Sequence, residues 1–191
     1  METKLKDIKY QLEQGYKLQN KVNKETLLRQ HEKQKKGKAA GIDKVTKEQY
    51  EKNIHENIEN VLTRMKNFSY RPQPVKRVYI PKGNGKVRPL GIPAYEDRLI
   101  QGAMADTLNE IYENIFLDCS YGFRPRRNCH QAIREINQTI MTKKVNYILD
   151  CDIKGFFDNV NHDILMQFLR KTIADENFLR YIVRFLKSGI M

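Results

Sequence analysis

The stretch VKRVYIPKGNGKVRPLGIP (75–93) decides the fold class, because two runs rich in Val, Ile and Tyr flank a Gly-Asn-Gly tip. This pattern predicts a β-hairpin. Pro81, Pro89 and Pro93 are expected at strand ends or edges, since proline has no N–H to donate to a strand ladder. The hairpin interrupts a chain whose remaining periodicity is mostly helical.

Outward from the hairpin, helical spacing of apolar residues predicts a series of helices. Before it, helices are expected over about 5–19, about 24–36, and from the capping box of Thr46 and Gln49 to about Arg64. After it, they are expected over about 96–114, 129–142, 155–159, 161–171 and 176–187, the last with Asp175 as its N-cap. VNYILDCDI (145–153), an apolar run ending in acids, is typical of a buried strand with a functional tip. The fold class is therefore α+β.

Composition restricts the classes of function. The chain has 191 residues, with 35 Lys and Arg against 23 Asp and Glu, so its formal net charge is +12. Such a surface attracts polyanions, either nucleic acid or an anionic membrane. No apolar run approaches the roughly 20 residues that span a bilayer, and the N-terminus does not resemble a signal peptide. Cys119, Cys129 and Cys151 form no CxxC pair, which favours a reduced protein in the cytosol.

Basic residues are concentrated between Asn60 and Tyr95, a window without Asp or Glu. Its cations are Arg64, Lys66, Arg71, Lys76, Arg77, Lys82, Lys86 and Arg88, and its aromatics are Phe68, Tyr70, Tyr79 and Tyr95. Cations bind phosphates and aromatic faces stack on bases, so the mixture suits a nucleic-acid groove. The alternative is a solvated hairpin that happens to be basic. The lysines of 33–38 lie either in a solvated loop or in a segment that contacts RNA.

The segment LDCDIKGFFDNVNH (149–162) carries the candidate chemistry. On a strand, Asp150 and Asp152 would share a face, and a carboxylate there could hold Mg²⁺, which prefers oxygen ligands. Two such ions about 3.5–4 Å apart support phosphoryl transfer. The alternative is that one aspartate caps a helix and the other is solvated. Lys82 and Lys86 beside the Gly-Asn-Gly tip could likewise bind a triphosphate or simply flank a turn.

Four blocks in order resemble bacterial group II intron-encoded reverse transcriptases of the maturase type. They are YIPKGNGKVRPLGIP (79–93), DRLIQ (97–101), SYGFRPRRNCH (120–130) and CDIKGFFDNVNH (151–162). GIDKVTKEQY (41–50) is similar to the N-terminal extension block of the same family. Retron, CRISPR-associated and diversity-generating reverse transcriptases share parts of these blocks. The resemblance implies helix-rich fingers with a β-hairpin, followed by the start of a polymerase right-hand palm.

The resemblance also implies roles for individual residues. Asp152 matches the first catalytic aspartate, a ligand shared by two Mg²⁺ ions, and the Ile153 carbonyl would complete the shell of one of them. Phe157 matches the steric gate against ribonucleotides, and its alternative role is core packing. Lys82 and Arg88 match the residues that grip the triphosphate of the incoming nucleotide. The residues expected on template or intron RNA are Lys76, Arg77, Arg124, Arg126 and Arg127.

The implied partners are group II intron RNA, an RNA template with a DNA primer, and deoxynucleotides, in the bacterial cytosol, and a homodimer is left open. The sequence departs from the family pattern at Lys44, where glycine is common, at Cys151, where alanine is common, and at Asn161, where aspartate is common. The family's second catalytic block, YxDD, does not occur in the 191 residues. We therefore expect an N-terminal extension (1–40), fingers (41–144) and a first part of the palm (145–191), without polymerase activity of their own. The alternative is a non-enzymatic RNA-binding module.

Overall fold

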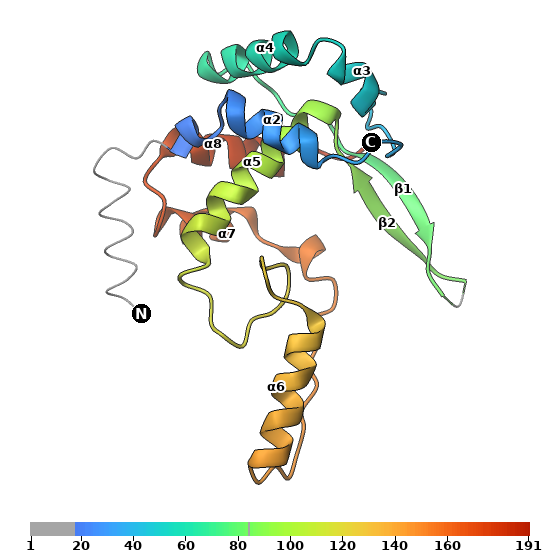
Figure 1. Ribbon diagram of the computed structural model, residues 1–191, viewed down its shortest axis with the longest axis vertical. Helices are drawn as coiled ribbons and strands as arrows, with labels where there is room; N and C mark the ends of the chain where they lie inside the picture. Colours follow the sequence, from blue (N-terminus) through green and yellow to red (C-terminus); the bar gives the residue numbers. More distant parts are fainter. Residues whose placement is uncertain (1–17, 84) are drawn as a thin grey trace.

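The computed structural model describes residues 18–83 and 85–191 and has an α+β fold (Figure 1). Its elements are η1 (Leu18–Lys21), α2 (Lys24–Lys33), α3 (Lys47–Glu51), α4 (Ile54–Lys66), β1 (Lys76–Pro81), β2 (Val87–Ile92), α5 (Tyr95–Tyr112), α6 (Cys129–Thr142), η2 (Phe157–Asn159), α7 (His162–Arg170) and α8 (Glu176–Leu186). Most of the predicted helix over 5–19 lies outside the described residues. Within those residues, no helix is both long and apolar enough to cross a bilayer.

The hydrophobic core lies in a helical body formed by α2, α3, α4, α5, α7 and α8. The last helix before the hairpin, α4, buries Ile58, Val61 and Met65 on one face. Leu99 and Ile100 of α5 and Phe178 and Leu179 of α8 belong to the same core cluster as this face. In Figure 1 the hairpin projects from one side of this body and α6 from another.

The helix predicted from Thr46 to Arg64 is interrupted. Its capping box is confirmed, because Thr46 Oγ1 accepts from the Gln49 N–H and Gln49 Oε1 accepts from the Thr46 N–H. Asn53, at φ −128° and ψ 38°, leaves the helical region and separates α3 from α4. Across the break, Asn57 Nδ2 donates to the Tyr50 carbonyl at 3.1 Å. A side-chain amide therefore takes up a carbonyl freed at the end of the first helix.

The predicted hairpin is confirmed as an antiparallel pair with Lys76 opposite Ile92 and Pro81 opposite Val87. The Lys82 N–H donates to the Lys86 carbonyl at 2.6 Å, which continues the same register one step toward the tip. The root of the hairpin is held by the chain's last residues, since Val75 forms a parallel bridge with Ile190.

The block GID (41–43) closes the body against the start of α5. A Cβ atom on Gly41 would lie 2.4 Å from the Pro93 carbonyl oxygen, so only glycine fits this approach. Asp43 Oδ2 accepts from the Tyr95 N–H at 2.7 Å and caps α5 from a distance in sequence. Lys44 adopts φ +57°, the left-handed region that favours glycine, which gives a physical reason why glycine is common at this position in the family.

The strand predicted over 145–153 is wrong. This segment has no regular secondary structure and its residues are exposed. In Figure 1 the chain turns at the end of α6 and runs back toward the body, and we call α6 together with residues 143–157 the arm. The physical reason is that a strand needs a neighbouring strand for its backbone hydrogen bonds, and no described segment pairs with this one.

Candidate nucleic-acid and nucleotide interface

The hairpin separates its cations between two faces, because side chains alternate along a strand. Lys76 and Arg88 belong to one face, and Lys82 continues that face toward the tip through its pairing with Lys86. Arg77 and Tyr79 belong to the opposite face, where the Tyr79 side chain is 62% exposed. The two residues predicted to grip a triphosphate are therefore brought together, with Lys76 on their side and Arg77 on the other.

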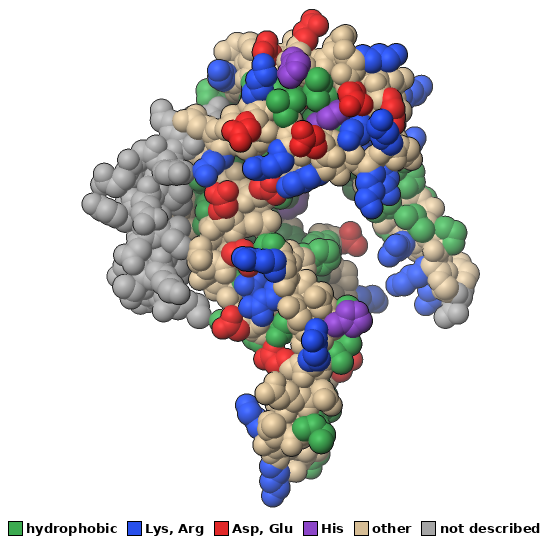
Figure 2. All heavy atoms as spheres, in the orientation of Figure 1, with side chains coloured by type: hydrophobic (Ala, Val, Ile, Leu, Met, Phe, Trp, Pro, Cys, Tyr) green, Lys and Arg blue, Asp and Glu red, His purple; other side chains and the backbone are tan. Residues whose placement is uncertain are grey.

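The hairpin offers these cations no competing carboxylate. Figure 2 shows Lys and Arg side chains along its length and no acidic side chain on it. None of the predicted hairpin cations forms an ion pair with any residue of 18–83 or 85–191. They are consequently available to phosphate groups, for which a fork-shaped guanidinium and a compact ammonium are complementary ligands.

A basic pocket of about 380 Å³ extends this surface onto the body. It lies between the end of α2 and β2, and its cations are Lys33, Lys35, Lys38 and Arg98. Within the described chain no carboxylate lines it. Arg98 is held in place by donating to the carbonyls of Ala39 and Pro93, both at 3.2 Å. The sequence does not indicate that Arg98 joins this pocket, because it is about sixty residues from the lysines of 33–38 in the chain. Those lysines are the part of the pocket that the sequence does indicate.

The three arginines of the loop 120–128 differ in burial and in their partners. Arg124 is buried and donates to both carboxylate oxygens of Glu113, at 3.1 and 3.2 Å, and to the carbonyls of Leu117 and Ser120. Its guanidinium thus closes the loop on itself, and its predicted RNA contact stays a prediction.

The two neighbouring arginines differ from Arg124. Arg127 pairs with Asp118 at 3.2 Å and lies over the Tyr121 ring. Arg126, at φ +61°, is exposed and forms no ion pair with a described residue. Of the three predicted contacts in this loop, Arg126 is the one left open to a ligand.

Asp152 and its neighbours lie on the exposed arm. Asp152, Ile153 and Phe157 all face solvent, with Ile153 70% and Phe157 79% exposed. The Phe157 ring meets the edge of Phe156 with centroids 5.5 Å apart. The oxygen donors of Asp152 and the Ile153 carbonyl suit Mg²⁺ in kind. They are too few to hold two ions, since no group of three His, Cys, Asp or Glu side chains with metal-binding geometry occurs in 18–83 and 85–191.

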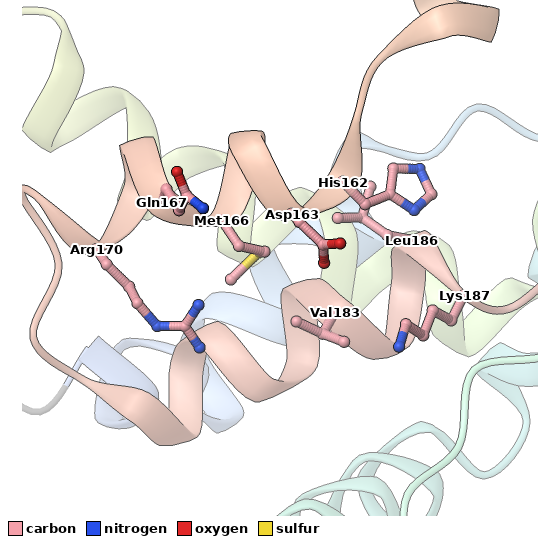
Figure 3. A pocket seen from close by; sticks show the side chains of 8 residues that line it. All are labelled: His162, Asp163, Met166, Gln167, Arg170, Val183, Leu186 and Lys187. Atoms are coloured by element: carbon pink, nitrogen blue, oxygen red, sulfur yellow. The ribbon is translucent and has the colours of Figure 1, made fainter.

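Another pocket lies away from all of these residues. Figure 3 shows a groove of about 350 Å³ between α7 and α8, lined by Met166 and Asp163 from α7 and by Val183 and the following Lys187 from the end of α8. No residue predicted to bind metal, nucleotide or RNA lines it. The candidate interface is therefore the hairpin and its adjoining basic pocket, and the arm carries Asp152, the residue predicted to bind metal.

An acid-free cationic hairpin on a helical body, followed by an exposed aspartate segment, forms a surface suited to the phosphates of nucleic acid. Residues 80–190 match the family model described as reverse transcriptase (RNA-dependent DNA polymerase). This match covers more than half of the chain, and the chain belongs to that family.

The relatives it matches include intron-encoded members, which confirms the resemblance seen in the sequence. The chain is 42% identical over 137 residues to the group II intron-encoded protein LtrA of Lactococcus lactis, covering 71% of this chain and 22% of that protein. It is 36% identical over 152 residues to protein YkfC of Escherichia coli, covering 78% of this chain and 40% of that protein. The nuclear intron maturase 1 of Arabidopsis thaliana is 32% identical over 97 residues, half of this chain and 13% of that protein. The chain thus spans less than half the length of these relatives.

Proposed function

We propose that this chain forms the fingers and the first part of the palm of an RNA-directed DNA polymerase encoded by a group II intron, which also binds its intron RNA to assist splicing. In this proposal residues 1–40 are an N-terminal extension, 41–144 the fingers and 145–191 the first part of the palm. The observation that carries it is the placement of Lys82 and Arg88 on one face of an acid-free hairpin, in a chain of the reverse transcriptase family.

Each group has a separate task in the proposed reaction. Lys82 and Arg88 bind the triphosphate of the incoming deoxynucleotide and neutralise its charge. Phe157 excludes a ribose 2′-hydroxyl. Arg77, Arg126 and the basic pocket contact the phosphates of the RNA template and of intron RNA, which position the nucleic acid without reading its sequence.

Members of this family use a divalent metal, and we propose two Mg²⁺ ions. Asp152 and the Ile153 carbonyl would bind them, and the bound metal would activate the attacking hydroxyl and stabilise the leaving group. This chain supplies a single carboxylate for that purpose, so it is expected to be inactive as a polymerase by itself. The three cysteines are free, which suits the reducing cytosol of a bacterium.

The proposal is tested by RNA binding to the 191-residue chain. Anisotropy of a labelled RNA duplex is measured from low to moderate salt for the wild type and for Arg77→Ala. Each phosphate contact in a duplex contributes about 0.9 to the slope of log affinity against log salt, so wild-type binding weakens steeply with salt and the variant has a shallower slope. Binding that is flat with salt, or a slope unchanged in the variant, would contradict an electrostatic groove on the hairpin. Asp163→Ala, in the groove of α7 and α8, is the matched control and is expected to bind as the wild type does.

A further inference from the structure

A buried carboxylate lies at the root of the hairpin. Asp97, in the first turn of α5, is 1% exposed and Tyr70 is 2% exposed. The Tyr70 hydroxyl donates to Asp97 Oδ1 at 2.5 Å, and the Gln73 N–H donates to Asp97 Oδ2 at 2.9 Å. Both oxygens of one carboxylate therefore hold the segment 70–75, which leads from α4 into β1.

The same segment is held from a second side. Arg184 of α8 donates to the Tyr70 carbonyl at 2.8 Å. The Val75 N–H donates to the Gly189 carbonyl at 3.0 Å, and the Met191 N–H donates to the Val75 carbonyl at 2.9 Å. The segment 70–75, which forms the root of the hairpin, is therefore held by Asp97 of α5 on one side. On the other side it is held by α8 and the residues that follow α8.

Beyond this root the tip of the hairpin extends away from the body (Figure 1), and residues 81–83 and 85–88 are exposed. From Gln73 to Lys82 an extended chain covers about 30 Å at about 3.3 Å per residue. A tilt of 10° at the root would thus move Lys82 by about 5 Å, which is more than the roughly 3 Å length of a hydrogen bond from its ammonium to a phosphate oxygen. The direction of the root consequently decides where Lys82 and Arg88 lie.

We propose that Asp97 is a positioning residue, which fixes the hairpin so that Lys82 and Arg88 meet the triphosphate of the incoming nucleotide. The inference rests on the proposed polymerase function. Burying a carboxylate costs free energy, because burial opposes its charge and raises the pKa of Asp97. An apolar side chain would fill the space as well, but it could not fix the Gln73 N–H and the Tyr70 hydroxyl in direction.

The test is steady-state primer extension by the full-length polymerase that contains this chain, varying the deoxynucleotide concentration. Asp97→Ala is expected to raise the nucleotide KM about tenfold or more while changing kcat less than about threefold, because binding of the triphosphate depends on the hairpin's direction. Asp97→Asn is expected to restore most of the affinity. Its oxygen can accept from Gln73, and its amide can donate to the Tyr70 hydroxyl.

Asp106→Ala is the matched control. Asp106 also lies on α5 and also accepts bonds from another element, from Gln30 at 2.7 Å and Lys33 at 2.9 Å, but it lies further along the helix, away from the hairpin root. It is expected to lower the thermal midpoint without changing the nucleotide KM. If Asp97→Ala does not fold, Tyr70→Phe removes one of the two donors and is expected to raise KM in the same direction by a smaller factor.

The outcomes separate this inference from the function on which it rests. A KM that rises in Lys82→Ala and Arg88→Ala but stays constant in Asp97→Ala and Tyr70→Phe would overturn the positioning role alone. A KM unchanged in Lys82→Ala and Arg88→Ala would overturn the nucleotide-binding role of the hairpin and the inference with it. An increase in all of them, reversed by Asp97→Asn, supports the proposal.

Discussion

The helical body and the arm differ in how their apolar residues are used. The body buries the apolar faces of α2, α4, α5 and α8 in one core, whereas no residue from 125 to 165 is buried. Ile133, Ile136 and Ile140 form a helical stripe on α6 that stays exposed, and Leu149 is 87% exposed. The residue with the strongest implied chemistry, Asp152, is on the arm.

This difference separates local from non-local determinants of structure. Helix α6 begins at a complete capping box, in which the side chains of Asn128 and Gln131 each accept from the other's N–H. Its backbone bonds are internal, so unlike a strand it needs no neighbouring segment to complete them. Residues 145–153 have β-type composition but would need bonds from another strand. We expect substitutions in the body to affect stability and substitutions in the arm to affect function.

The largest expected contrast in stability is between two isoleucines. Ile58→Ala in the body should cost about 2–5 kcal/mol of unfolding free energy, because Ile58 is fully buried and its removal leaves a cavity. Ile136→Ala on α6 should cost less than about 0.5 kcal/mol, because that side chain is 57% exposed. Urea denaturation of the 191-residue chain measures both. Equal losses would mean that the arm is packed as tightly as the body.

Phe157→Ala sharpens the same contrast within the arm. As a steric gate, its loss in the full-length polymerase should raise the use of ribonucleotides relative to deoxynucleotides, because a clash has been removed. The thermal midpoint of the 191-residue chain should hardly change, since the ring is 79% exposed. As a core residue, Phe157 would instead cost about 3–5 kcal/mol on removal. A constant ratio of ribo- to deoxynucleotide incorporation together with a lower midpoint would reject the gate.

His31 should make the stability of the body depend on pH. Burial, and secondarily the charge of Lys47, lowers the pKa of His31, whose Nδ1 lies 2.9 Å from the Tyr95 hydroxyl. A folded-state pKa below the unfolded value near 6.5 gives stability that is present above about pH 6.5 and is lost as pH falls through the folded value. The loss can reach about 1.4 kcal/mol per pH unit for one proton.

Chemical denaturation of the wild type and His31→Gln between pH 7.5 and 5 measures this effect. The wild type is expected to lose stability more steeply than the variant. His130→Gln on α6 is the control, because that exposed side chain can be replaced without loss of folding stability. Parallel curves for the wild type and His31→Gln would show that His31 protonates as easily in the folded protein as in the unfolded one.

The smallest effect concerns the backbone of Lys44. Lys44→Gly should raise the unfolding free energy by about 0.5–1 kcal/mol, because relief of the left-handed conformation exceeds the entropic cost of glycine. Lys52→Gly is the matched control. Lys52 is an exposed lysine with helical φ −56°, and glycine there should cost up to about 1 kcal/mol. A destabilised Lys44→Gly would show that the Lys44 side chain contributes more than its backbone costs.

Elements with local signals could be predicted from the sequence. The hairpin, α6 and the caps at Thr46 and Asp175 follow from turn residues and capping side chains a few positions apart. The break at Asn53 could not be predicted, because the apolar spacing continues across it. The strand over 145–153 was wrong because composition does not reveal whether a pairing partner is present.

The candidate site was predictable to a similar extent. The grouping of Lys82 with Arg88 follows from strand alternation and hairpin register, both of which the turn residues fix. The commitment of Arg124 to Glu113 depends on how a loop folds back on a helix, which no sequence pattern specifies. Asp97 resembles an ordinary first-turn acid of α5, and its two bonds to the hairpin root are visible only in three dimensions.

The most direct test of the account is primer extension on poly(rA)/oligo(dT) by the full-length protein carrying Asp152→Asn. The account predicts that DNA synthesis falls by at least about 10²–10³-fold, the range for removing one electrostatic stabiliser of a transition state, while RNA binding and the thermal midpoint stay unchanged. Asp150→Asn, two residues away on the same exposed segment, should retain activity. Primer extension at the wild-type rate by Asp152→Asn would show that Asp152 is not a metal ligand and would contradict the proposed role of the arm.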